Sequence, residues 1–169
     1  CLVGSEMCIR DRDIAELGST FRNVGIVYQK SVSTFVADIA AALQSKGTNV
    51  HLFAVPDAEA GKTLVVAEEL WMSCGNAGIT RADAIMGVGG GAATDLAGFI
   101  ASTWMRGIAF ISCPTSLLGM VDAGVGGKTG INNAIGKNLI GTFHEPRGVF
   151  IDLSVLHTLP RACLLYTSD

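Results

Sequence analysis

The stretch Ala84-Ile85-Met86-Gly87-Val88-Gly89-Gly90-Gly91-Ala92-Ala93-Thr94-Asp95 decides the fold of this 169-residue chain. Its first part is an apolar run that predicts a buried strand, and its last part opens a helical pattern that continues to Thr103. A glycine triplet alone is also typical of a flexible turn, and this one is not the GxGxxG fingerprint. Between a strand and a helix, however, it lets backbone N–H groups approach a phosphate. We therefore expect a domain that holds phosphorylated ligands, in particular a dinucleotide.

Strands and helices alternate on both sides of this stretch. The predicted strands, each a short apolar run, are Val24–Tyr28, Val50–Val55, Ala84–Val88, Ile108–Cys113 and Val149–Asp152. The predicted helices run from Val32 to near Gly47, with an apolar pattern that reaches Leu43, and over Thr63–Ala77, Ala92–Thr103 and Ser116–Val121. Alternation with short connections predicts an α/β fold, a Rossmann-like parallel sheet with helices on both faces. Five glycines between Gly124 and Gly136 predict a loop-rich stretch in which the backbone passes close to something.

Composition limits the partners of the chain. Apolar residues make up 49% and charged residues 16%, so a sizeable core can form. A net charge of −3 without a basic run argues against nucleic acid. No apolar run is long enough for a membrane span, and the five cysteines include no CxxC pair. We expect no membrane partner and a cytoplasmic, reducing location.

The two ends do not fit this pattern. Residues 1–12 show no helical or strand period that continues past residue 13, and residues 162–169 stop without a capping element. Both resemble translated sequencing-adapter read-through, and two ordinary frayed termini are the alternative. We expect residues 13–161 to form the native domain.

Charged residues beside glycines are the first candidates for ligand contacts. Lys128 follows Gly127 and Lys137 follows Gly136, in surroundings otherwise poor in charge. A lysine in such a turn is suited to an anion. Arg106, before Gly107, belongs to the same group with a weaker signal. The three histidines show no metal-ligand spacing, so we expect no metal site in this chain.

Other candidates have two interpretations. Asp95 opens the predicted helix, where a carboxylate either complements the helix dipole or accepts a hydrogen bond from a ligand hydroxyl. Glu59 and Lys62 follow the second strand, where solvated charges at a helix start are the favoured interpretation. Thr115 and Ser116 follow the fourth strand and either cap the next helix or bind ribose or phosphate.

Taken together, these motifs resemble the 3-dehydroquinate synthase family, in order and in spacing from about Val24 to Arg161. The residues that carry the resemblance are Pro56–Lys62, Gly89–Phe99, Trp104–Gly107, Pro114–Leu118, Val121–Asp122, Gly126–Gly130, Gly136–Gly141 and Leu159–Arg161. The resemblance implies an N-terminal NAD-binding α/β domain, followed in the family by a helical C-terminal domain. It also implies a phosphosugar substrate, 3-deoxy-D-arabino-heptulosonate 7-phosphate (DAHP), and a homodimer.

In this family NAD takes a hydride transiently, phosphate leaves, and a divalent metal, zinc or cobalt, polarises the oxidised carbonyl. The metal ligands, one Glu and two His, lie downstream of Leu159-Pro160-Arg161 and are therefore absent from this chain. We expect that the chain alone turns nothing over.

The resemblance also assigns roles by position. Asp57, Glu59 and Lys62 would hold the adenosine side of NAD. The full set of expected cofactor contacts is Asp57, Glu59, Lys62, Gly90, Gly91, Asp95, Thr115, Ser116, Lys128, Lys137 and Thr158. The expected catalytic or substrate contacts are Lys128, Asp122, Arg106 and Asn138.

The chain departs from the family pattern at several positions. Thr94 replaces a usual glycine, Ser116 a threonine, Ala123-Gly124 a serine pair and His157 a lysine. Other sugar-phosphate cyclases, such as 2-deoxy-scyllo-inosose or 2-epi-5-epi-valiolone synthase, remain alternatives. A non-catalytic NAD-binding module is the alternative from another class. Iron-type alcohol and glycerol dehydrogenases share the ancestral fold but lack the paired glycine-lysine motifs.

Overall fold

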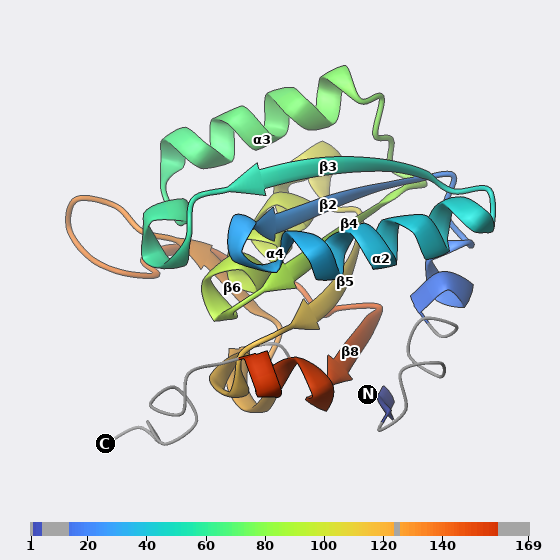
Figure 1. The fold of residues 1–169 in the computed structure, drawn as a ribbon. Coiled ribbons are helices and arrows are strands. Elements are labelled where there is room, and N and C mark those ends of the chain that lie inside the picture. Colours follow the sequence, from blue (N-terminus) through green and yellow to red (C-terminus); the bar gives the residue numbers. More distant parts are fainter. Residues whose placement is uncertain (1, 5–13, 124–125, 159–169) are drawn as a thin grey trace.

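Six parallel strands form the central sheet of the computed structural model, which describes residues 2–4, 14–123 and 126–158 (Figure 1). Their order across the sheet is β1-β8-β5-β4-β2-β3. The strands are β1 (Leu2–Gly4), β2 (Asn23–Gln29), β3 (Asn49–Val55), β4 (Ala84–Gly89), β5 (Ala109–Pro114) and β8 (Gly148–Asp152). Each pair of neighbours runs parallel, which confirms the predicted Rossmann-like α/β sheet. Only β1, which pairs with β8, lies where the sequence shows no strand pattern.

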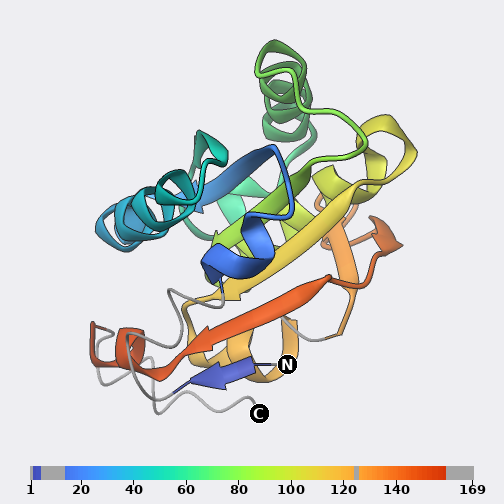
Figure 2. The same ribbon diagram turned by 90° about the vertical axis from the view of Figure 1, so that its right-hand side faces the viewer.

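Helices cover the sheet on both faces, as the alternation predicts. The α-helices are α2 (Ser33–Ser45), α3 (Leu64–Asn76) and α4 (Gly91–Thr103), and residues 14–18 are also helical. Shorter turns are η1 (Lys30–Val32), η2 (Ala58–Gly61), η3 (Trp104–Arg106), the π-helix η4 (Gly119–Ala123) and η5 (Leu153–Thr158). Figure 2 shows α2 on the opposite side of the sheet from α4. The expected helix over Ser116–Val121 is a short helical segment at 117–118 that continues into η4.

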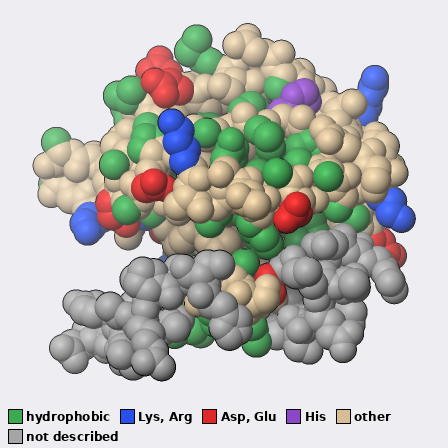
Figure 3. Space-filling view, viewed as in Figure 1, with side chains coloured by type: hydrophobic (Ala, Val, Ile, Leu, Met, Phe, Trp, Pro, Cys, Tyr) green, Lys and Arg blue, Asp and Glu red, His purple; other side chains and the backbone are tan. Residues whose placement is uncertain are grey.

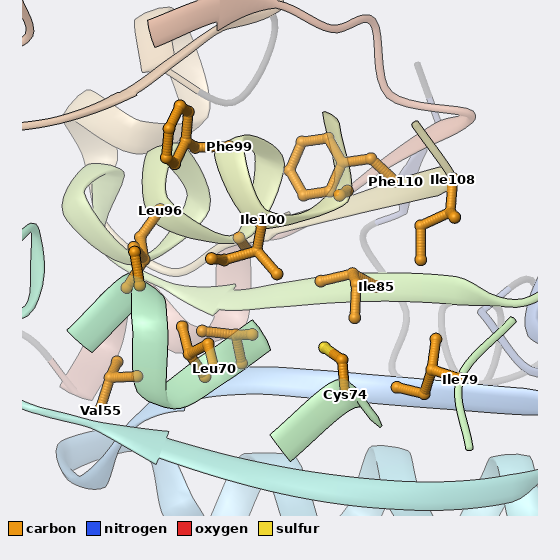
Figure 4. Packing of buried hydrophobic residues seen from close by; sticks show 14 of the residues in the cluster. Val55, Leu70, Cys74, Ile79, Ile85, Leu96, Phe99, Ile100, Ile108 and Phe110 are labelled. Carbon is orange, nitrogen blue, oxygen red and sulfur yellow. The ribbon is translucent and has the colours of Figure 1, made fainter. Parts of the chain in front are cut away.

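The core forms two layers because successive strand residues point to opposite faces. Ile85 of β4 packs with Leu70 and Cys74 of α3 and with α4 (Figure 4). Its neighbour Met86 packs on the other face with Ile39 of α2. The buried free thiol of Cys74 has its pKa raised to about 12 by desolvation, so it acts as a small apolar side chain.

In the glycine-dense stretch, residues 132–136 form a loop, as the sequence predicts, but residues 128–131 form a strand that the sequence analysis missed. β6 (Lys128–Ile131) and β7 (Ile140–Phe143) form an antiparallel hairpin. The hairpin covers the side of α4 that faces away from the sheet: a Cβ on Gly98 of α4 would clash with the Thr129 side chain. Because α4 lies between the sheet and the hairpin, eight of its residues from Ala93 to Ala101 are buried.

Charges on the outside are mixed. On the face seen in Figure 3, Lys and Arg side chains are interspersed with Asp and Glu. Within the described ranges, no helix combines the length and apolarity that crossing a membrane requires.

Candidate functional site

The carboxyl ends of four neighbouring strands meet at one edge of the sheet. The registers place Gln29 of β2 beside Val55 of β3, and Gly89 of β4 beside Pro114 of β5. The segments that follow these strands therefore come together there. In open parallel sheets this edge is where ligands bind.

A first pocket, the helix-start pocket, lies at the N-terminus of α4. Its volume is about 490 Å³, and it is lined by Gln29, Ser31, Asp57, Ala58, Glu59, Gly90, Gly91 and Ala92. The Gln29 Oε1 accepts a hydrogen bond of 3.0 Å from Gly90 N and so fixes the glycine turn. The first N–H groups of a helix lack intrahelical acceptors and carry a partial positive charge. This pocket is therefore suited to an anionic group, and it gathers four predicted cofactor residues: Asp57, Glu59, Gly90 and Gly91.

Thr115 and Ser116 border the same turn. Thr115 is buried and its N–H donates to the Gly89 carbonyl at 2.8 Å. The Ser116 hydroxyl accepts from Gly119 N at 3.2 Å, as a helix cap does, and it lies close to Gly90. The capping role of Ser116 is thus present in the structure, while its position beside Gly90 keeps it next to the pocket.

A buried ion pair lies behind the turn. Lys62 Nζ donates to Asp95 Oδ2 at 2.6 Å and to Asn138 Oδ1 at 2.6 Å, and the Lys62 side chain is only 2% exposed. The interpretation of Lys62 as a solvated charge is therefore wrong. Asp95 is the fifth residue of α4 rather than its opening residue, and its carboxylate pairs with Lys62. A helix-dipole role does not account for it, because the dipole acts mainly within the first turn.

Two opposing effects act on Asp95. Desolvation raises the pKa of Asp95 above its usual value, and the hydrogen bond and charge of Lys62 oppose this rise. Glu59 and Asp122 add a smaller rise through their like charges. Asp95 therefore feels the negative charges of Glu59 and Asp122 as well as the positive charge of Lys62.

A second pocket, the hairpin pocket, has a volume of about 450 Å³. It opens between α4, η4 and the hairpin, and is lined by Asp95, Asp122, Ala123, Gly126, Lys128, Thr129, Gly130, Asn138, Leu139, Gly141, Thr142 and Phe143. Three of the four expected catalytic residues, Asp122, Lys128 and Asn138, are brought together here. A site with an ammonium group, carboxylates and an amide can bind a polar, anionic small molecule.

The structure does not bring Arg106 into this group. Arg106 follows the C-terminus of α4, about 20 Å along the helix from its N-terminus. It lines a separate pocket with Arg81 and Arg147. Lys137 is exposed on the loop between β6 and β7, and Thr158 ends η5 with a side chain outside the described residues.

The sequence analysis did not identify two residues that take part in the site. Gln29 is a buried polar residue at the end of an apolar strand, a signal that could have identified it. Asn132 donates from Nδ2 to Glu59 Oε2 at 2.6 Å, but it lies 73 residues from Glu59 and its surroundings carry no signal for that contact.

The fold and the site together define a Rossmann-like α/β domain with its polar residues gathered at the carboxyl edge of the sheet. The family model for the N-terminal part of 3-dehydroquinate synthase matches residues 52–165. The chain therefore belongs to the 3-dehydroquinate synthase family.

Relatives and solved structures agree with this assignment. The 3-dehydroquinate synthase of Corynebacterium efficiens is 59% identical over 143 residues, which are 85% of this chain and 39% of that protein. A structure of 2-deoxy-scyllo-inosose synthase complexed with carbaglucose-6-phosphate, NAD+ and Co2+ has a TM-score of 0.82 and 29% identity, covering 90% of this chain and 42% of that one. The 2-epi-5-epi-valiolone synthase from Streptomyces hygroscopicus subsp. jinggangensis 5008, with NAD+ and Zn2+ bound, has a TM-score of 0.83 and 30% identity, covering 96% and 45%. The chain thus spans about two fifths of the length of the curated relatives it matches.

Proposed function

We propose that this chain is the NAD-binding domain of an enzyme that converts DAHP to 3-dehydroquinate and phosphate, a carbon–oxygen lyase. The observation that carries the proposal is the convergence of Asp57, Glu59, Gly90 and Gly91 on the helix-start pocket, next to the hairpin pocket that holds Asp122 and Lys128. The family match and the 59% identity to a 3-dehydroquinate synthase support this choice of reaction.

The helix-start pocket fits NAD. The N-terminus of α4 offers backbone N–H groups to a diphosphate, and a glycine at position 90 leaves the approach open. The carboxylates of Asp57 and Glu59 can accept hydrogen bonds from ribose hydroxyls, and Thr115 and Ser116 border the turn. NAD, when bound, supplies a reversible hydride acceptor.

The hairpin pocket would take the phosphosugar and the nicotinamide end. In it, the Lys128 ammonium group attracts the anionic substrate, and Asp122 accepts hydrogen bonds from its hydroxyls. Asn138 presents its Oδ1 to Lys62, so its Nδ2 donor remains for an acceptor in the pocket. Lys137, on the exposed loop beside Asn138, adds positive charge near the opening, and Thr158 would complete the cofactor contacts.

The divalent metal of the family does not fit the described residues. Residues 14–123 and 126–158 include no group of three or more His, Cys, Asp or Glu side chains that could hold a metal ion. We assign the metal ligands to the part of the enzyme that lies beyond this domain. Residues 13–161 are then the cofactor domain of a cytoplasmic homodimer, and the chain alone binds NAD without releasing phosphate from DAHP.

A chimaeric enzyme tests this proposal. Residues 14–158 replace the corresponding segment of the Corynebacterium efficiens relative, and phosphate release from DAHP is measured with NAD and Zn2+ or Co2+. We expect release by the chimaera and none by the 169-residue chain. Metal-dependent loss of DAHP with the isolated chain would overturn the second expectation.

Another sugar-phosphate cyclase is the second candidate, since two structural neighbours at 29% and 30% identity carry the names of such enzymes. A hexose 6-phosphate offered to the same chimaera tests the 2-deoxy-scyllo-inosose synthase alternative, since that relative was solved with carbaglucose-6-phosphate. Release from the hexose phosphate but not from DAHP, by a folded chimaera that binds NAD, would favour this alternative.

A further inference from the structure

Asn132 ties three segments of the molecule together at the point where the chain leaves β6. Its backbone N–H donates to the Lys62 carbonyl at 2.8 Å. Its side-chain Nδ2 donates to Glu59 Oε2 at 2.6 Å, and its Oδ1 accepts from Asn138 N at 2.9 Å. A carboxylate can only accept and a backbone N–H can only donate, so the orientation of the Asn132 amide is fixed.

Asn138 depends on this contact. It adopts a left-handed backbone conformation, with a φ of 57°, which asparagine enters more readily than most non-glycine residues. The hydrogen bond from its N–H to Asn132 and the one from Lys62 to its Oδ1 hold that conformation. Asn138, held by these two bonds, is one of the residues that line the hairpin pocket.

Asn132 therefore contacts one residue of each pocket. Glu59 lines the helix-start pocket, and Asn138 lines the hairpin pocket. Asn132 itself lines neither of them. Lys62 also contacts both residues, through its N–H to the Glu59 carbonyl at 3.1 Å and its Nζ to Asn138 Oδ1. Asn132 differs from it in bonding the Glu59 carboxylate, the group that would face a ligand.

We propose that Asn132 is a positioning residue that couples the two pockets. A nucleoside diphosphate in the helix-start pocket orders Glu59, and Glu59 orders the Asn132 side chain. Asn132 in turn holds Asn138 in position to bind the phosphosugar. The nucleotide thus prepares the second pocket for its ligand by restricting the loop between β6 and β7. The inference rests on the proposed function, because it takes the helix-start pocket as the nucleotide site.

The test uses ADP, which fills the helix-start pocket but lacks the nicotinamide that would reach the second one. Amide hydrogen exchange of Asn138 is measured by NMR in the 169-residue chain with and without saturating ADP. We expect ADP to slow this exchange by about tenfold, within the usual range of coupling between sites.

Two variants separate coupling from simple structural support. Asn132→Asp keeps the acceptor for the Asn138 N–H but sets a second carboxylate against Glu59, so exchange without ADP stays near the wild-type rate while the response to ADP is lost. Adding Glu59→Gln restores a donor–acceptor pair with the roles exchanged, and we expect the response to return. Asn133→Ala is the matched control, because Asn133 caps only its own loop through Ile135 N and Gly136 N.

The outcomes are distinct. If ADP binds but leaves the exchange of Asn138 unchanged, or if Asn132→Asp and Asn133→Ala behave alike, the coupling is refuted while the proposed function stands. If ADP fails to bind the folded chain, the nucleotide site itself is refuted and the inference falls with it.

Discussion

An aspartate lies just before β4 and another lies in the helix that follows it, and the two are held in different ways. Asp83 precedes the strand, is 2% exposed and accepts four hydrogen bonds, from the backbone and side chain of both Asn23 and Thr80. Asp95 follows the strand, in α4, and has one ammonium partner. Its side chain keeps 20% exposure toward the hairpin pocket. The carboxylate at the amino end of the sheet has its hydrogen bonds filled within the protein, whereas the carboxylate at the carboxyl end can still bind a ligand.

The pKa values follow this difference. Burial alone would raise the pKa of Asp83, but the hydrogen bonds from Thr80 and Asn23 outweigh it and hold the pKa below 3.8. Burial raises the pKa of Asp95, and a single lysine only partly offsets it. A carboxylate at the edge of a pocket whose desolvation is not fully offset by its partners is typical of a functional position. A carboxylate whose hydrogen bonds outweigh its desolvation is typical of a structural position.

The largest expected effect is on stability, at the amino end. Asp83→Ala leaves four donors without their acceptor and should lower the free energy of unfolding by about 4 kcal/mol. Chemical denaturation measures this, with Asp38→Ala on the exposed face of α2 as a control. NAD affinity should change by less than about twofold where the variant is still folded. A large loss of NAD affinity would mean that the amino end of the sheet also influences the cofactor site.

The next largest effects are expected from removing the ammonium group of Lys62. Lys62→Met leaves the Asp95 carboxylate and the Asn138 amide without their buried donor, and should cost about 3 kcal/mol of stability. Unlike the Asp83 variant, it should also weaken NAD binding, by about tenfold. Chemical denaturation measures the first effect, and titration calorimetry on the folded fraction measures the second. Unchanged affinity would make Lys62 purely structural.

Asp95→Asn should affect binding more than stability. The amide oxygen can still accept from Lys62, but the charge that a ligand donor meets is gone, so NAD affinity should fall by about tenfold and unfolding should change by about 1 kcal/mol. The reverse ranking of the two effects would contradict the assignment of Asp95 to the site.

The pH dependence of unfolding should separate the two aspartates. Because the folded pKa of Asp83 is depressed, its contribution is present above pH 3.8 and is lost as the pH falls through the folded value. Because the folded pKa of Asp95 is raised, the free energy of unfolding falls as the pH rises from 3.8 through the pKa of the folded state. The urea midpoint of the wild type should fall both as the pH drops below 3.8, through Asp83, and as it rises above 3.8, through Asp95. Asp83→Asn should lack the first loss, and Asp95→Asn should lack the second.

The smallest effect is expected at Arg106. Since it lies at the far end of α4, Arg106→Ala should change unfolding by less than about 0.5 kcal/mol and NAD affinity by less than about twofold. A tenfold loss of NAD affinity in the isolated chain would place Arg106 at the cofactor site, which neither the sequence analysis nor the structure indicates.

The sequence was sufficient for most of the sheet but not for the contacts within the site. Apolar runs with short connections predict β2 to β5 and β8 to within a residue or two. The hairpin was missed because its glycines look like a loop: a Cβ on Gly130 would meet the Ile140 carbonyl at 2.8 Å, so glycine marks a close strand approach there. Lys62 lies 33 residues from Asp95 and 76 residues from Asn138, and neither local pattern nor composition reveals such hydrogen-bonded pairs.

The measurement that tests the carboxyl edge most directly is a calorimetric titration of NAD into the purified chain, with Asp95→Ala and Lys137→Ala beside it. Saturable binding, weakened by about tenfold in both variants, is the expected result. A cooperatively folded chain that binds no NAD, or variants that bind it as well as the wild type, would contradict the assignment of this edge as the cofactor site.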